Sequence, residues 1–289
     1  MTTMKEIAEK TGVSVSTVSL VLNKRDVGRV KPDIAQRVRQ TATDLGYKPN
    51  PLARSLRTSK TRILGFISEE VATTPYAGGI ILGAQDAAST YGYMLITVST
   101  DGQASEESEI AALKRYGVDG FFYSKMSNRI ATVPKSLSDY PVVLVDATDA
   151  NNTLPSVEPD EFQIAYDATS RLIEAGCERI AYVGCSENMI AQDGRLAGYR
   201  AALEGTDHGF DASLVCNVLN NGPALRAVDA LFNTCNPDGF FCFNDARAWY
   251  VYECAARRGL TVGKDLSVVG VDNHRVFAET LEPQLTTVE

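Results

Sequence analysis

Candidate ligand-binding residues come after short apolar runs that are typical of β-strands. They are Asp146, Asn244, Asp245 and Asp272 at the ends of three runs, Arg195 at the start of a helix after another, Asp101 after the second run and Tyr76 in the loop after the first. Ligands of open α/β sheets bind beyond the carboxyl ends of the strands. Carboxylates, amides and an arginine suit a polyhydroxylated ligand, because each hydroxyl both donates and accepts hydrogen bonds. Singly, each Asp or Asn is better explained as a helix or turn cap, whereas the three strand ends together favour a pocket.

Alternating apolar runs and helical stretches position these residues. The predicted strands are 63–67, 93–98, 120–123, 141–146, 179–183, 215–219, 239–243 and 267–271, and the predicted helices are 78–91, 106–116, 161–175, 194–203, 225–233 and 246–258. Nearly continuous β-rich runs between helices are typical of parallel sheets covered on both faces. The sequence from Arg62 onwards therefore predicts two α/β halves.

A small helical head precedes these halves. Thr3 and Glu6 form a capping box for a helix over 4–11, and Gly12 permits the sharp turn that follows. Ser14 caps a second helix, and Pro32 opens a third that runs to about 45. The exposed first residues of such a second helix are those that the major groove of DNA receives, here Val15, Ser16 and Ser19, with Leu20 one turn along. The alternative is a helical hairpin that packs only on itself.

Charge favours the first interpretation. The first 62 residues hold 13 Lys and Arg against 5 Asp and Glu, a net charge of +8, whereas the rest hold 15 against 31, a net charge of −16. A basic head matches the electrostatic footprint of a polyphosphate partner. The alternative is a solvated basic face without a partner.

The segment after the head predicts a short helix. Asn50 is a good N-cap and Pro51 suits the first helical position. Leu56 lies on a strip flanked by Arg54 and Arg57, a combination that can insert a wedge into the minor groove while cations hold phosphates. The alternative is a linker with two incidental arginines.

The head resembles that of LacI/GalR-family transcriptional repressors. The matching motifs are Lys5-Glu6-Ile7-Ala8, Gly12-Val13-Ser14, Thr17-Val18-Ser19, Val21-Leu22-Asn23, Leu45-Gly46-Tyr47-Lys48-Pro49-Asn50 and Ala53-Arg54-Ser55-Leu56. The resemblance implies a homodimer on double-stranded operator DNA, with Leu56 as the intercalating leucine and Val15, Ser16 and Leu20 as base readers. Leu20 departs from the arginine of many members and cannot make their bidentate guanine contact, so apolar contact or shape readout must serve. The expected DNA-contacting residues are Thr3, Val15, Ser16, Thr17, Ser19, Leu20, Asn23, Arg29, Tyr47, Asn50, Ala53, Arg54, Leu56 and Arg57.

The core resembles the same family. The matching motifs are Arg195-Leu196-Ala197-Gly198-Tyr199, Phe243-Asn244-Asp245, Ser267-Val268-Val269-Gly270-Val271-Asp272 and Leu285-Thr286-Thr287-Val288. The resemblance implies a periplasmic-binding-protein-like core with a sugar or nucleoside-like effector in its cleft, contacted by Arg195 and Asp272 and lined by Asp146 and Asn244. Family members usually continue for several tens of residues after the last motif, so we expect the C-terminal subdomain to be truncated.

Two other functional classes are weaker alternatives. For a hydrolase of the same ligand, the sequence holds no Gly-x-Ser-x-Gly, GxxxxGK or HExxH motif and only two histidines, although carboxylate pairs could still do acid–base work. For an exported sugar receptor, it lacks a signal-peptide run and has a basic head. Six cysteines without a CxxC pair are typical of reduced thiols in a cytoplasmic protein. We expect no catalytic residue, cofactor, metal or membrane partner.

The sequence thus predicts an all-α helix-turn-helix head and an α/β core of two subdomains with parallel sheets. The expected divisions are a DNA-binding domain at 1–47, a hinge at 48–61, an N-terminal subdomain at 62–158 and a C-terminal subdomain at 159–289. The predicted function is a cytoplasmic, ligand-responsive repressor.

Overall fold

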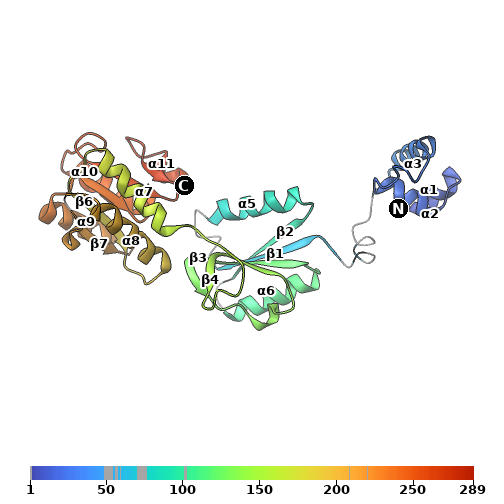
Figure 1. Ribbon diagram of the computed structural model, residues 1–289, viewed down its shortest axis with the longest axis horizontal. Coiled ribbons are helices and arrows are strands. Elements are labelled where there is room, and N and C mark those ends of the chain that lie inside the picture. Colours follow the sequence, from blue (N-terminus) through green and yellow to red (C-terminus); the bar gives the residue numbers. More distant parts are fainter. Residues whose placement is uncertain are drawn as a thin grey trace. The chain divides into compact units, whose positions relative to one another are not determined.

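A computed structural model describes residues 2–48, 55, 58, 60–69, 77–100, 103–207, 209–219 and 221–289 (Figure 1). Its internal contacts separate two units, a head, Met1–Thr61, and a core, Arg62–Glu289. The predicted helix at Asn50 and the predicted site residues Asn50, Ala53, Arg54, Leu56, Arg57, Tyr76 and Asp101 lie outside the described residues. The described parts confirm the predicted fold class, an all-α head and a core with two parallel sheets.

The head forms through local capping signals. Its described residues form α1 (Met4–Thr11), α2 (Val15–Leu22) and α3 (Pro32–Asp44). The Thr3 side chain accepts a hydrogen bond from the backbone of Glu6, and Gly12 ends α1 at φ 69°. Ser14 caps α2 in the same way, with Thr17 N–H donating to its Oγ at 3.1 Å. The inward faces of the helices form one apolar cluster, Ile7, Ala8, Val18, Val21, Ala35, Val38 and Ala42.

The N-lobe, Ile63–Val157, is a five-stranded parallel sheet with helices on both faces. Its elements are β1 (Ile63–Glu69), α5 (Ala77–Thr90), β2 (Met94–Thr100), α6 (Gln103–Arg115), β3 (Gly120–Ala131), β4 (Val142–Asp149) and β5 (Ser156–Val157). The strand order is β2-β1-β3-β4-β5. The chain passes from β1 to β2 in one direction along the sheet and then from β2 back past β1 to β3 in the other. Right-handed crossovers therefore place α5 on one face and α6 on the other (Figure 1).

The C-lobe, Glu161–Val288, repeats this plan. Its elements are α7 (Glu161–Glu174), β6 (Ile180–Cys185), α8 (Ile190–Glu204), β7 (Val215–Val218), α9 (Gly222–Cys235), β8 (Gly239–Cys242), α10 (Asp245–Arg257), β9 (Ser267–Val271), α11 (Arg275–Ala278) and β10 (Thr286–Val288). The strand order is β10-β9-β8-β6-β7, and all pairings are parallel. The carboxyl ends of the strands therefore meet at one edge of the sheet, as the predicted site requires.

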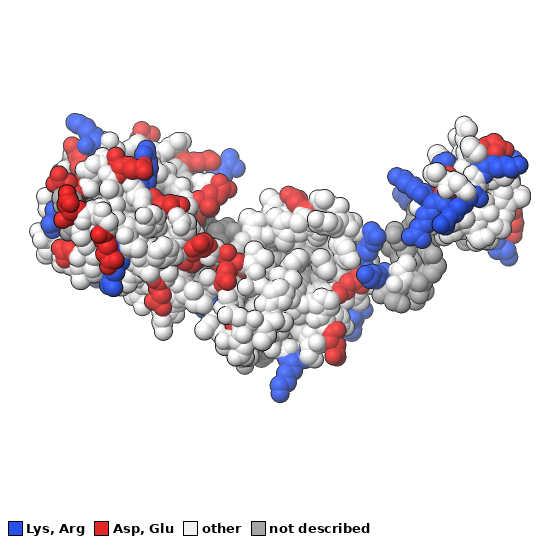
Figure 2. Space-filling model, in the orientation of Figure 1, with Lys and Arg blue, Asp and Glu red and all other residues white. Residues whose placement is uncertain are grey.

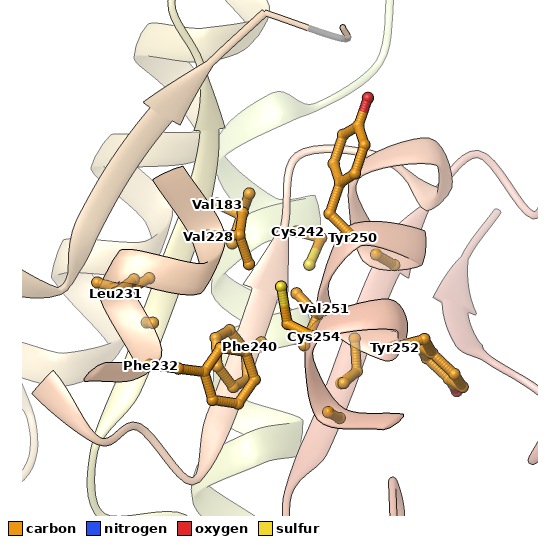
Figure 3. Close-up of a cluster of buried hydrophobic side chains, with 14 of the residues drawn as sticks. Val183, Val228, Leu231, Phe232, Phe240, Cys242, Tyr250, Val251, Tyr252 and Cys254 are labelled. Atoms are coloured by element: carbon orange, nitrogen blue, oxygen red, sulfur yellow. The ribbon is translucent and has the colours of Figure 1, made fainter. Parts of the chain in front are cut away.

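Alternation along β6 explains why the C-lobe has two apolar layers. Ala181 and Val183 pack with α9 and α10 in a cluster that includes Phe240 and Val251 (Figure 3). Ile180 and Tyr182 point the other way, because successive side chains of a strand face opposite sides, and pack with α7 and α8. All six cysteines are free, and burial raises the pKa of the Cys242 and Cys254 thiols.

Helices α7 and α8 approach each other closely through two glycines of α8. A Cβ at Gly194 would lie 2.7 Å from the Cβ of Glu161, and one at Gly198 would overlap the carbonyl oxygen of Phe162. Because glycine has no Cβ, the backbones can touch there. This contact brings Arg195 of α8 against Glu161 of α7.

Some predicted boundaries were wrong. Helix α8 begins at Ile190 rather than at 194, so Arg195 lies in its second turn; Met189 at the N-cap makes no side-chain cap that a sequence could reveal. Strand β3 continues past 123 to Ala131, through an irregular register between Ser124 and Arg129. The short elements β5, β10 and α11 were not predicted.

Candidate functional site

The first turn of α2 presents a polar and apolar surface to solvent. Val15 is 45% exposed and Ser16 is exposed, whereas Val18 and Val21 are buried on the opposite side of the helix. Leu20 is partly buried at the border between the two faces. The residues that sequence analysis assigned to base contact are therefore those that packing within the head leaves available.

Local hydrogen bonds fix the polar side chains of this surface. Ser14 Oγ lies 2.7 Å from Ser16 Oγ and 2.9 Å from Thr17 Oγ1. One turn further, Asn23 Nδ2 donates to the Ser19 carbonyl oxygen at 2.7 Å. These contacts orient the hydroxyl and amide groups before any ligand arrives, which reduces the conformational entropy that binding would cost.

The remaining described candidates of the head lie around the same three helices. Thr3 is exposed at the N-cap of α1, and Arg29 is exposed in the α2–α3 loop. Tyr47 packs partly against the apolar cluster of the head, and burial raises its pKa. In Figure 2, lysine and arginine side chains gather on the visible face of the head, while acidic side chains are frequent on the C-lobe. The surface charge thus agrees with the net charges of the two segments.

Arg195 is the centre of the candidate site in the core. Its Nε donates to Glu161 Oε2 at 2.6 Å, and both side chains are less than a tenth exposed. Its Nη1 donates to the carbonyl oxygen of Phe243, and its guanidinium carbon lies 4.4 Å from the centre of the Phe243 ring. The ion pair and the cation–π contact hold the guanidinium at the carboxyl end of β8.

Asp272 lies at the end of β9 in an unusual electrostatic environment. The net pKa of Asp272 is raised to about 7, chiefly by burial; Arg195 lowers this pKa, and the carboxylates of Asp245 and Glu161 raise it. Its backbone φ is 100°, a region that is strained for a residue with a side chain. Arg195 is thus near enough to Asp272 to lower its pKa, and both residues lie at the carboxyl edge of the C-lobe sheet.

Asn244 and Asp245 have structural contacts. Asn244 Oδ1 accepts a hydrogen bond from Arg247 N–H at 3.1 Å and so caps α10. Asp245 is fully buried, and its carboxylate accepts from His274 N–H at 2.6 Å and from Thr287 Oγ1 at 2.7 Å. Burial raises the pKa of Asp245. The carboxylate of Asp245 thus joins α10 to the segment after β9 and to β10.

Asp146 also bonds to the protein backbone. Its two carboxylate oxygens accept hydrogen bonds from Ser127 N–H and Asn128 N–H, each at 2.9 Å. These amides belong to the irregular part of β3, so Asp146 stabilises that bend. Beside it, Asn128 Oδ1 and Ser124 Oγ are buried without a hydrogen-bond partner in the described structure, and a ligand or water could satisfy both.

Glu161 and Phe243 belong to the site but were not predicted from the sequence. Glu161 resembles an ordinary acidic residue in the first turn of a helix, and its pairing with Arg195 spans 34 positions. Phe243 follows an aromatic strand and resembles a core residue, yet Arg247 also lies over its ring, at 5.0 Å. A polar network in the N-lobe was not predicted either: Lys125 pairs with Glu69 at 2.8 Å, and Tyr123 donates to buried Glu106 at 2.5 Å.

The described residues contain no helix long and apolar enough to cross a membrane. The assembled core site offers a guanidinium, carboxylates and an aromatic ring along the carboxyl edge of the C-lobe sheet. Such a set can bind a ligand that carries several hydroxyl groups, because donors and acceptors are both present.

Comparison with known proteins places both units. Residues 3–50 match the family described as bacterial regulatory proteins, lacI family, and residues 61–289 match the periplasmic binding proteins and sugar binding domain of LacI family. The chain is 33% identical to the HTH-type transcriptional regulator RegA of Clostridium saccharobutylicum over an alignment of 295 positions. The alignment covers 99% of this chain and 87% of RegA. It is 29% identical to the sucrose operon repressor of Escherichia coli, over 100% of this chain and 89% of that protein.

A solved structure has the same architecture. It is the complex of the transcriptional regulator CelR with cellobiose, which matches with a TM-score of 0.65 and 26% identity over 99% of this chain and 87% of that one.

Proposed function

This chain belongs to the LacI family of transcriptional regulators, and we propose that it is a repressor that binds operator DNA as a homodimer and responds to a sugar-type effector. Like its relatives, the protein is a transcriptional regulator and not an enzyme. The observation that carries the proposal is the exposed first turn of α2 on a head of net charge opposite to that of the core.

DNA binding would use two elements. The first is α2, whose Val15, Ser16 and Leu20 would read base edges in the major groove. The second is the hinge, where Leu56 between Arg54 and Arg57 would open the minor groove. The hinge part of the proposal rests on sequence, because those three residues lie outside the described residues. A regulator of transcription acts where the DNA is, so we place the protein in the cytoplasm.

The proposed effector site is Arg195 with Asp272, supported by Asn244, Asp245 and Asp146. The Arg195 and Asp272 side chains offer donors and acceptors, whereas the carboxylates of Asp245 and Asp146 hold backbone amides and would shape the site. The acid-rich surroundings of Asp272 disfavour an anionic ligand and favour a neutral polyhydroxylated one. A relative named sucrose operon repressor and a solved relative in complex with cellobiose are consistent with this class.

Exposed apolar residues on the N-lobe support the homodimer. Leu82 of α5 is 59% exposed, and Tyr91 and Met94, which follow α5 and begin β2, are also exposed. Strand β2 is the edge strand of its sheet. Exposed large apolar side chains near an edge strand are candidates for a protein–protein interface, and a second copy of the chain is the proposed partner.

Duplex binding by the full chain tests the DNA part of the proposal. The chain is used to enrich sites from a random duplex library, and the affinity for the enriched duplex is then measured by fluorescence anisotropy at increasing KCl. We expect the logarithm of the affinity to fall steeply and linearly with the logarithm of the salt concentration, because phosphate contacts release counterions. A chain that enriches no duplex and shows no salt-dependent binding is not a repressor.

A sugar panel tests the effector part. Sucrose, cellobiose and their monosaccharides are added in a thermal-shift measurement, in which a ligand of the native state raises the unfolding temperature. The sugar that stabilises the chain is then added to the duplex titration, where it must change the apparent affinity for DNA. A stabilising sugar that leaves the DNA affinity unchanged is not the effector.

A further inference from the structure

The loop between α2 and α3 exposes an apolar residue among cations. Val27 is 91% exposed, the highest value among the large hydrophobic residues that the structure describes. Lys24, Arg25 and Arg29 around it are also exposed. A single exposed valine is ordinary on a protein surface. What distinguishes Val27 is that the loop holds it in a defined position.

A buried carboxylate organises the loop. Asp26 is only 7% exposed, and its Oδ2 accepts from Arg39 Nη2 of α3 at 2.5 Å. The carbonyl oxygen of Asp26 accepts from Arg29 N–H and Val30 N–H, each at 2.9 Å. The ion pair and the two backbone bonds therefore fix both ends of the short segment that carries Val27.

Backbone geometry gives the loop its shape. Lys24 has φ 57° and Gly28 has φ 72°, so the chain takes a left-handed conformation on each side of Val27. A lysine in this conformation is uncommon and persists where surrounding contacts impose it. Arg25 N–H donates to the Leu20 carbonyl oxygen at 2.9 Å, which attaches the loop to the end of α2.

The position of the α2–α3 loop determines which groups of a bound duplex it can contact. Helix α2 has eight residues and is about 12 Å long. If its first turn lies in the major groove, the loop at its other end lies against the edge of that groove, where phosphates and deoxyribose are exposed. Arginine and lysine suit the phosphates, and a valine side chain suits the apolar faces of deoxyribose and thymine methyl groups.

We propose that Val27 is a further DNA-contacting residue of the α2–α3 loop, the loop that also holds the expected contact Arg29, and that the Asp26–Arg39 pair positions Val27 against apolar groups of the duplex between cations that contact phosphates. Val27 is the contact residue, and Asp26 and Arg39 are positioning residues. This inference rests on the proposed function.

The first test exchanges one methyl group for a hydroxyl. Val27→Thr in the full chain keeps the shape of the side chain and, at this exposure, the stability of the head. We expect its affinity for the duplex enriched by the wild type to fall about fifteen-fold, because one methyl group is returned to water in each of the two heads of the homodimer. The slope of affinity against salt stays unchanged, whereas Arg25→Met lowers that slope by about two, one phosphate contact in each head. Val157→Thr, at a 65% exposed valine of the core, is the matched control and binds as the wild type.

The second test asks whether the ion pair acts through Val27. The double variant Asp26→Asn, Arg39→Gln is compared with the wild type, with Val27→Thr and with the triple variant. We expect the double variant to lower duplex affinity several-fold. We also expect it to abolish the further effect of Val27→Thr, because a displaced loop no longer holds the Val27 side chain against the duplex. Arg39→Lys, which keeps the charge, should restore most of the affinity. A purely structural pair lowers the unfolding temperature but leaves binding, measured well below that temperature, unchanged.

The outcomes are distinguishable. If the wild type enriches no duplex, the proposed function fails and this inference fails with it. If the wild type binds but Val27→Thr has the same affinity and sequence preference, only the role of Val27 is overturned. If the effects of Val27→Thr and of the double variant add, the positioning role of Asp26 and Arg39 is overturned.

Discussion

Arg195 combines a structural contact with a proposed recognition contact. Its ion pair with Glu161 is buried on both sides, so neither charge has water to compensate for the loss of the other. A test of effector binding that truncates Arg195 therefore also tests the stability of the α7–α8 contact. The two effects have to be separated by a variant that restores charge balance.

We predict that Arg195→Met lowers the free energy of unfolding by about 3–5 kcal/mol, because it leaves the Glu161 carboxylate buried and unpaired. The double variant Arg195→Met, Glu161→Gln should recover most of that loss, since no isolated charge remains. Urea unfolding followed by circular dichroism measures both. Effector response should stay absent in the double variant although its fold is stable; a normal response there removes Arg195 from the site.

The raised pKa of Asp272 predicts that the free energy of unfolding depends on pH. Below its ordinary pKa of 3.8 the folded and unfolded chains both hold the proton, and above about 7 both have lost it. Between these values the folded chain binds the proton more tightly, so the free energy of unfolding falls as pH rises, by at most about 1.4 kcal/mol per pH unit. Asp245 acts in the same direction, since burial raises its pKa too.

Asp272→Asn should flatten this profile. The variant keeps the shape of the side chain but cannot ionise, so its stability relative to the wild type improves between pH 4.5 and pH 7.5. Urea unfolding at four pH values within that range measures the difference between the two chains. Parallel profiles would show that Asp272 titrates normally in the folded chain.

At the scale of elements, the α7–α8 contact positions the site. We predict that Gly198→Ala destabilises the core by about 1–3 kcal/mol, because the added Cβ would overlap the Phe162 carbonyl oxygen and push the helices apart. Gly205→Ala is the control, since its Cβ would lie 3.7 Å from the nearest atom, the Ala202 carbonyl oxygen. Urea midpoints compare the two. Equal stability would mean that the helices adapt without cost.

The elements differ in how far the sequence predicts them. Thr3 and Ser14 mark helix starts because an N-cap and the amide it accepts from are only three positions apart. The pairing of Glu161 with Arg195 depends instead on two helices that meet at glycines, and no local pattern encodes it. Asp146 shows a second limit. Its strand-end position is the same for a ligand-binding carboxylate and for one that accepts backbone amides, so only the structure reveals the amide contacts.

At the scale of the whole molecule, the proposed mechanism requires two heads on one operator. Each head offers one short reading helix, and a family of this kind gains specificity by placing two half-sites in register. The strength of dimerisation therefore sets the apparent affinity for DNA, because the second head binds at the high effective concentration that the first provides. The exposed apolar residues Leu82, Tyr91 and Met94 of the N-lobe are where this dependence can be tested.

We predict that Leu82→Lys weakens the homodimer by at least ten-fold, since in a symmetric interface it would bury two charges against apolar surface. Sedimentation velocity at micromolar concentration should then show a shift from dimer to monomer, and the affinity for the enriched duplex should fall together with it. Leu219→Lys, at a 47% exposed leucine after β7, is the matched control and should leave both unchanged. A Leu82→Lys chain that remains dimeric would place the interface on another face; a monomeric chain that keeps full affinity for the duplex would show that one head suffices.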